Sequence, residues 1–274
     1  MFWRILKKDL KRKKTMNIIL LLFVVLCSMF AAASVNNIIA VVGGLDYYFE
    51  KAELGDYFII ERSTGGEDTI SKILKHSENV SEYKTYNVVN ASCDDLKTDS
   101  GKLMEFSNIA LICDINNTKQ NFFGMDNEVI TDVEKGKVYI TGSVPKREGV
   151  KIGERFYVEL GDTKLLLEVA GFAKDALLGS EMMGNPRLLI NSADFETLTA
   201  DETIHTYSCG HVYDIDTDNA AALESELNEQ NGMLFSGDRD LIKMTYIMNM
   251  LVAADRVIRS IEIHDPFHDR RRIP

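Results

Sequence analysis

A run of thirty uncharged residues, from Met16 to Leu45, dominates the first part of the chain. Within it, the stretch Ile18–Val35 is apolar apart from Ser28 and Ser34. Because a helix rises about 1.5 Å per residue, about 20 such residues cross the hydrocarbon core of a bilayer. The pattern predicts a membrane-spanning helix over residues 16–45. The side chains expected in the bilayer include those of Ile18, Leu22, Val25, Met29 and Val35.

A basic cluster directly precedes this run. Residues 1–14 hold seven Lys or Arg and one Asp. Since basic flanks of spanning helices stay in the cytoplasm, residues 1–15 are predicted to be cytoplasmic and the chain after Leu45 extracytoplasmic. The expected location is therefore the cell membrane. The residues that set this topology are Lys7, Lys8, Lys11, Arg12, Lys13 and Lys14.

A cleavable signal peptide is a competing interpretation of the amino terminus. Residues 31–33 are three alanines that follow the apolar core Ile18–Phe30, and such small residues resemble a cleavage site. The uncharged run continues a dozen residues beyond them, which is longer than a signal peptide needs. The pattern favours a membrane anchor.

Residues 46–54 keep the helical spacing of apolar positions and predict a short stalk outside the bilayer. Residues 55–238 then mix short strands and short helices without strict alternation, which predicts an α+β domain. A hairpin is expected around Gly161-Asp162, because this turn pair separates two β-rich runs. The strands are predicted at 56–61, 80–89, 109–115, 138–141, 155–160, 164–173, 187–191 and 207–215. The helices are predicted at 68–76, at 193–198 with Ser192 as its cap, and at 219–228 with Asp218 as its cap.

A second apolar stretch begins the last segment, residues 239–274. Leu241–Ala254 numbers 14 residues, which is too short to cross a bilayer alone, and a charged tail follows. Two interpretations stay open. The stretch is the opening of a second spanning helix, or residues 239–263 form an amphipathic helix that lies on the outer membrane surface.

The charge distribution limits the possible partners. The chain has a net charge of −11, and since residues 1–14 contribute +6 and residues 15–45 none, residues 46–274 carry −17. Nucleic acids and anionic membranes require cationic patches, so no nucleic-acid partner is expected. Three cysteines outside the apolar run, Cys93, Cys113 and Cys209, are too few for a disulfide framework.

The common enzymatic motifs are missing from the sequence. It contains no G-x-x-x-x-G-K-[ST], so no ATP hydrolysis by this chain is expected. It also lacks G-x-S-x-G, H-E-x-x-H and C-x-x-C. We therefore expect no enzyme, no cofactor and no catalytic or metal-binding residue in this chain.

Four groups of residues have the spacing of a metal or ligand site, but each has a simpler structural interpretation. His205, Cys209 and His211 have the spacing of zinc ligands but lack a fourth partner. The aspartates 214, 216 and 218 resemble the start of a calcium loop, although the glycine and the final glutamate of such a loop are missing. The pair His264 and His268 is separated by a proline that disrupts a helix. Met182-Met183 lies among glycines and could contact a ligand, but methionines more often fill gaps in a core.

The order of these parts resembles a known family. The sequence FWRILKKDLKRKK and an apolar helix are followed by GKVYITGSVPKREGVKIGERFYVEL, LLLEVAGFAKD and PRLLINSADFETL. A V-x-G-x-x-x-D pattern closes the predicted hairpin, from Val169 to Asp175. In this order the motifs are similar to the first transmembrane helix and extracytoplasmic core domain of FtsX-like (MacB-type) ABC transporter permeases, over about residues 1–254.

The resemblance implies a permease subunit that couples a separate cytoplasmic ATPase to the export or extraction of a peptide, lipoprotein or other amphipathic substrate. Its partners would be an ABC-type ATPase, a second permease chain and the lipid bilayer. The helix from Ile18 through Leu54 would serve as a lever. The charged tail after Ala254 departs from the family, and we expect a truncated or frameshifted permease. The alternative is a single-pass anchored module that binds an extracytoplasmic partner without transport.

Overall fold

The computed structural model describes residues 14–62, 69–106, 109–180, 184–201, 204, 208–227 and 233–263. The chain divides into two compact units, residues 1–47 and residues 48–274. The described residues of the first unit, 14–47, form most of a single helix. The second is a mixed α+β domain, which confirms the predicted fold class.

That helix is α2 (Lys14–Lys51), which is continuous and whose last turn belongs to the second unit. The described part of the chain has this one helix that is long and apolar enough to cross a membrane. The five side chains expected in the bilayer, from Ile18 to Val35, are all exposed along it. Lys14 is its first residue, whereas the other topology-setting residues, between Lys7 and Lys13, lie outside the described residues.

The second unit is built on one mixed sheet, with the strand order β12-β1-β11-β2-β5-β10-β7-β9-β8-β3-β4 and β6 beside β9. Neighbouring strands are antiparallel except for the parallel pairs β5–β10 and β7–β9. The strands are β1 (Tyr57–Arg62), β2 (Glu82–Ala91), β3 (Leu96–Thr98), β4 (Gly101–Lys102), β5 (Ala110–Asp114), β6 (Phe123–Gly124), β7 (Lys137–Thr141), β8 (Arg155–Leu160), β9 (Thr163–Lys174), β10 (Arg187–Ile190), β11 (Cys209–Asp216) and β12 (Met233–Asp238).

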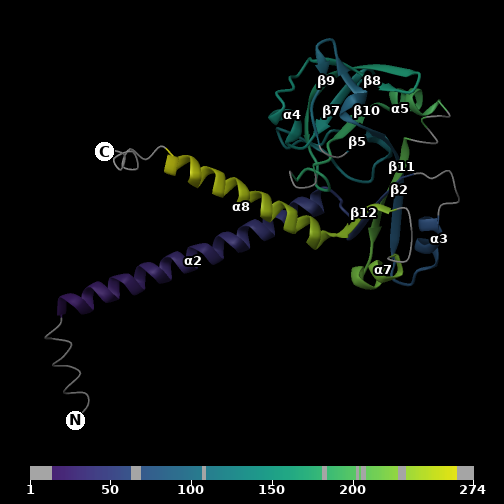
Figure 1. Ribbon diagram of the computed structural model, residues 1–274. Coiled ribbons are helices and arrows are strands. Elements are labelled where there is room, and N and C mark those ends of the chain that lie inside the picture. Colours follow the sequence, from purple (N-terminus) through teal and green to yellow (C-terminus); the bar gives the residue numbers. More distant parts are fainter. Residues whose placement is uncertain are drawn as a thin grey trace, which may run out of the picture. The chain divides into compact units, whose positions relative to one another are not determined.

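Short helices lie around this sheet, and one long helix follows its last strand (Figure 1). The helices are α3 (Thr69–His76), α4 (Val144–Arg147), α5 (Ser192–Thr199), α7 (Ala220–Leu227) and α8 (Arg239–Ile263), with 3-10 turns at Cys93–Asp95 and Ile115–Asn117. The α8 helix continues past Asp255-Arg256, so the charge step there does not end it.

Side chains cover both faces of the sheet at its β1 end. Because β1 is buried on both faces, consecutive residues of this strand are apolar. Its alternate residues Tyr57 and Ile59 pack with the leucines and isoleucines of α3 and α7. The intervening residues Phe58 and Ile60 pack on the other face, in a cluster that includes Phe49 from the last turn of α2 and Ile242 from α8. The two long helices therefore contribute side chains to the domain core.

The local predictions hold best where turn chemistry is strong. The β8–β9 hairpin has the predicted turn, with Gly161 in the left-handed region at φ 55°. Two predicted helix caps were wrong by one residue. Asn191 caps α5 by accepting from the Ala193 amide, and the Asn219 side chain accepts from the Ala222 amide at the start of α7. The strands β3, β4, β6 and β12 were not predicted.

Candidate functional site at the helix junction

The chain enters and leaves the domain at one place. β12 runs antiparallel beside β1, with Tyr57 opposite Asp238, so the end of α2 and the start of α8 are neighbours. Arg239, the first residue of α8, donates from its amide to the Asp56 carbonyl at 3.0 Å. Its guanidinium donates to the carbonyls of Gly55, at 2.9 Å, and Leu54. One side chain of α8 thus binds the short link between α2 and β1.

The carboxyl end of α2 is capped by hydrogen bonds. Glu53 adopts the left-handed conformation at φ 53°, and the amides of Glu53 and Leu54 donate to the carbonyls of Glu50 and Phe49. This is the Schellman arrangement, which satisfies helix carbonyls that would otherwise lack donors. Asn121 adds a donor from its amide to the Ala52 carbonyl. The side chains of Phe49 and Leu54 are both buried, so α2 ends as part of the domain core.

Gly55 allows the link to pass close to a buried carboxylate. Its amide donates to Asp214 Oδ1 at 2.7 Å, and a Cβ at this position would stand 2.0 Å from the same oxygen. Only glycine fits without displacing Asp214. The close approach fixes the position of the chain where it turns from helix to strand.

Aromatic rings join the two helices next to this link. The ring of Tyr246 on α8 meets Phe49 at 6.0 Å and Tyr48 at 6.4 Å between centroids, both edge to face. Such pairs contribute about 0.5–1.5 kcal/mol each beyond area burial. One turn earlier on α8, Ile242 is almost fully buried. The first turns of α8 are therefore docked on the domain beside the end of α2.

An ion pair without solvent contact lies beneath the junction. Arg187 Nε is 2.7 Å from Asp175 Oδ2, and Arg187 Nη2 donates to Asp175 Oδ1 at 2.9 Å; both side chains have no exposed surface. Arg187 Nη1 also donates to Tyr86 Oη and Arg187 Nη2 to Gln120 Oε1, each at 2.7 Å. The Arg187 amide donates to Thr141 Oγ1 at 2.8 Å. A buried charge pair needs such additional hydrogen bonds to offset its desolvation.

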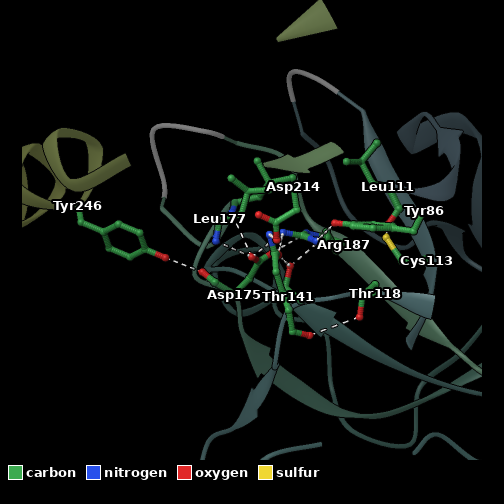
Figure 2. A network of polar contacts seen from close by, with 12 residues as sticks. Tyr86, Leu111, Cys113, Thr118, Thr141, Asp175, Leu177, Arg187, Asp214 and Tyr246 are labelled. Carbon is green, nitrogen blue, oxygen red and sulfur yellow. Dashed lines mark hydrogen bonds and ion pairs between the residues drawn. The ribbon is translucent and has the colours of Figure 1, made fainter. Parts of the chain in front are cut away.

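The network continues from this pair to both helices. Gln120 Nε2 donates to Asp214 Oδ2 at 3.3 Å, and Asp214 in turn accepts from Gly55 after α2. On the other side, Figure 2 shows Tyr246 pointing toward Asp175, where its hydroxyl donates to the Asp175 carbonyl at 2.5 Å. A continuous chain of polar contacts therefore connects the end of α2, through the domain core, to α8.

Asp175 also shapes the segment that follows it. Its Oδ1 accepts from the amides of Leu177 and Leu178 at 2.9 and 3.0 Å. Farther along, Ser180 Oγ accepts from Asn249 Nδ2 at 3.0 Å. Residues 175–180 are thus held by the buried ion pair from one side and by α8 from the other.

Burial controls the titration of the groups around the pair. Desolvation raises the pKa of the Asp214 carboxyl, and Lys119 partly opposes this shift. Desolvation also raises the pKa of Tyr48, with the nearby Asp175 as the second cause. Burial raises the pKa of the Cys113 thiol to about 12. These groups pair with one another, and Arg187 Nε meets Asp175 Oδ2 as an ion-pair contact without the geometry of a hydrogen bond. Together they connect the last turn of α2, the sheet and the first turns of α8.

The residues that the sequence offered as possible metal ligands or ligand contacts either have structural roles or lie outside the described residues. Asp214 and Asp216 are engaged internally, the second with Lys119 Nζ at 2.8 Å. Cys209 and His211 lie on β11, and burial raises the pKa of the Cys209 thiol. The methionine pair at 182–183 and the histidines 205, 264 and 268 lie outside the described residues.

Sequence reasoning missed the residues of the network as functional candidates. Asp175 and Arg187 were present in the motifs of the resemblance, as the end of V-x-G-x-x-x-D and the start of RLLIN. An arginine that opens a buried apolar strand was a usable signal, because a charge there requires a partner. Gln120, Asp214 and Tyr246 gave no comparable signal.

Comparisons with known proteins give little beyond this geometry. No protein family and no curated protein matches the sequence. Among solved structures, the chain is similar to a Bacillus anthracis protein provisionally described as a lipoprotein, with 5% identity and a TM-score of 0.38 over 66% of this chain and 95% of that one. It is also similar to a domain of a Porphyromonas gingivalis protein provisionally described as a permease, with 14% identity and a TM-score of 0.32 over 64% and 85%. Likenesses at these scores say nothing about function.

Proposed function

We propose that this chain acts as a permease subunit of an ABC transporter of the FtsX-like (MacB-type) kind, with α2 in the cell membrane and the α+β domain outside. The observation that carries the proposal is the helix junction. The domain is inserted between two long helices whose adjoining ends are joined by Arg239 and by the rings of Tyr48, Phe49 and Tyr246. A domain inserted between consecutive membrane helices has this construction.

The proposed role is mechanical and not catalytic. A separate cytoplasmic ATPase would change the tilt of α2, and a continuous helix transmits a tilt along its length. The Schellman closure and the bond from Gly55 to Asp214 give the end of α2 no free hinge. Movement of α2 would then reach residues 175–180 and α8 through the buried network.

The proposal names three partners. These are the ABC-type ATPase, a second permease chain and the lipid bilayer, with a peptide, lipoprotein or other amphipathic molecule as the substrate. The acidic domain, with −17 over residues 46–274, favours a substrate or partner that is not strongly anionic.

Co-purification tests the proposal directly. The full chain, tagged and extracted from its native membranes, is expected to retain a protein with nucleotide-binding motifs in a fixed ratio. Cross-links are expected between that protein and residues 1–14 of this chain, because these residues are the proposed cytoplasmic side. A preparation in which every cross-link of residues 1–14 goes to lipid or to proteins without such motifs contradicts the proposal.

A single-pass anchored module without transport is the second candidate. It is favoured by one observation: within the described ranges, α2 is the one helix with the length and hydropathy of a membrane span. The module would bind an extracytoplasmic partner through the domain. The absence of an ATPase from the purified complex, together with a stoichiometric extracytoplasmic protein, would favour this candidate.

A further inference from the structure

A surface cavity lies where β7 and β9 meet the segment that leads into β8, three strands that run side by side in the sheet (Figure 1). Its volume is about 310 Å³, at the small end of the range for ligand sites, about 300–1,000 Å³. The lining residues all belong to the α+β domain, and the polar network beneath the helix junction contributes none of those described. The size suits a short segment of a larger molecule.

One wall of the cavity is apolar and open to solvent. It includes Ile152, which has an exposed fraction of 66%. The half-buried Tyr139 ring lies beside it and packs on Gly171, where a Cβ would stand 2.8 Å from Tyr139 Cε1. On β9, the exposed Leu166 shares a face of the strand with the lining residue Glu168. These side chains give a partner apolar area to remove from water.

The charged groups of the lining are mostly negative. The carboxylates of Asp132, Glu134 and Glu168 all line the cavity. Lys137, the one cation of the described lining, has its Nζ 2.6 Å from Glu134 Oε2. Outside the lining, Arg155 Nε is 2.8 Å from Glu168 Oε2. Among the described residues, the exposed Asp132 has no such partner, so its carboxylate is available to an incoming cation.

We propose that this cavity, here named the β7–β9 cavity, binds a peptide segment in which a lysine or arginine stands beside an apolar residue. The basic side chain pairs with Asp132, and its apolar neighbour contacts Ile152 and the Tyr139 ring. The charge of −17 over residues 46–274 attracts such a segment and disfavours an acidic one or a second copy of the domain. The inference rests on the proposed extracytoplasmic placement of the domain, and it adds where the substrate binds and which charge it carries.

Two peptides of opposite charge test the cavity. The full chain in a non-ionic detergent is titrated into fluorescein-labelled KLKLKL or ELELEL, and fluorescence anisotropy is measured with empty micelles as the blank. We expect KLKLKL to bind and ELELEL not to bind. The affinity for KLKLKL should fall as salt is added, because salt screens an exposed charge pair. A chain that binds both peptides equally, or neither of them, overturns the inference.

Matched variants locate the binding site. Asp132→Lys should weaken KLKLKL binding about fivefold and allow ELELEL to bind, because it reverses the available charge. Ile152→Ser removes apolar contact and should weaken KLKLKL binding by a similar factor, about fivefold. The controls are Glu196→Lys, on α5, and Met125→Ser, at a side chain with an exposed fraction of 64%; both positions lie outside the lining. Each control should leave the affinity within about twofold. Circular dichroism verifies that all four variants fold.

The outcomes separate this inference from the permease function. KLKLKL binding that is unchanged in Asp132→Lys and Ile152→Ser overturns the inference, because the peptide then binds elsewhere, and it leaves co-purification of an ATPase unaffected. Binding that these variants weaken, in a chain that retains no ATPase, overturns the permease proposal and leaves the β7–β9 cavity as a binding site. A native dimer that Ile152→Ser dissociates, as measured by light scattering, would mean that a second copy occupies the cavity, which also overturns the inference.

Discussion

Arg187 constrains this domain because its charged side chain has no exposed surface. Transfer of an unpaired ion into a protein interior costs several kcal/mol, which a partner in good geometry must offset. Asp175 supplies that partner through two contacts, and Tyr86 and Gln120 each accept one further hydrogen bond. Such a pair contributes little net stability but penalises any arrangement that separates its members.

Removal of one member should therefore be severe. We expect Arg187→Met to lower the free energy of unfolding by about 3–5 kcal/mol, because it leaves the Asp175 carboxylate buried and uncompensated. Urea titration of the full chain in detergent, followed by circular dichroism, measures the change. The matched control is Arg155→Ala, which removes an exposed pair with Glu168 and should cost less than about 1 kcal/mol. Equal losses in the two variants would contradict a special role for the buried pair.

Asp214 predicts a pH dependence with a definite sign. Burial raises the pKa of its carboxyl in the folded protein, so the folded state holds the proton to higher pH than the unfolded state does. Its contribution to stability therefore falls as the pH rises from about 4 through the raised pKa. We expect the difference in unfolding free energy between the native chain and Asp214→Asn to shift in favour of the variant over this range.

Urea titrations of both proteins at several pH values measure that difference. Other titrating groups cancel because the two chains share them. A difference that is constant with pH, or that moves in favour of the native chain as the pH rises, is the contrary result.

At the scale of elements, the junction determines how α2 and α8 connect to the sheet. α2 ends in a Schellman closure, passes Gly55 and becomes β1, while β12 returns beside β1 to start α8. Each connection is short and hydrogen-bonded, and Arg239 joins both ends. The last turn of α2 and the first turn of α8 are therefore connected to the sheet without a long loop.

A pair of glycine substitutions tests the junction. Gly55→Ala places a Cβ 2.0 Å from Asp214 Oδ1 and 2.8 Å from the Ile215 carbonyl oxygen, so it should destabilise the domain by about 1–3 kcal/mol. Gly43→Ala on α2 is the control, because a Cβ there meets nothing within 4 Å. Chemical denaturation of the full chain measures both. A Gly55→Ala protein as stable as Gly43→Ala would mean that the link has room to move.

At the scale of the whole molecule, charge asymmetry should decide orientation. Replacement of Lys7, Lys8, Lys11, Arg12, Lys13 and Lys14 by serine removes most of the positive charge before the span, and a mixed orientation is expected. Protease added outside spheroplasts should digest the domain of the native chain completely and leave a protected fraction of the variant. A control with arginine at each of these lysines keeps the charge and should behave like the native chain.

The predictable features of this fold are those that depend on neighbours in sequence. The β8–β9 hairpin was predicted because Gly161 and Asp162 separate two β-rich runs, and turn chemistry acts over a few residues. The strand β12 was missed because its residues MLFSGD show no alternation and gain their partner from β1, far away in the chain. Even the cap of α5 depended on which of two adjacent side chains turned toward the Ala193 amide.

The candidate site was beyond prediction for the same reason. Asp214 stood in the sequence within a spaced set of aspartates, and nothing local shows that it bonds a glycine 159 residues away. The contact of Tyr246 with Asp175 spans 71 residues and depends on how α8 docks. Such contacts follow from the register of distant strands, which packing of the whole core determines.

The sequence by itself determined the apolar helical segment Ile18–Val35, its expected span and orientation, and the α+β class, because hydropathy, charge and short-range periodicity act along the chain. Only the tertiary structure decided that Arg187 meets Asp175 without solvent exposure and that the end of α2 and the start of α8 share one junction. Burial and the pairing of remote groups are properties of the folded core, and no local pattern encodes them.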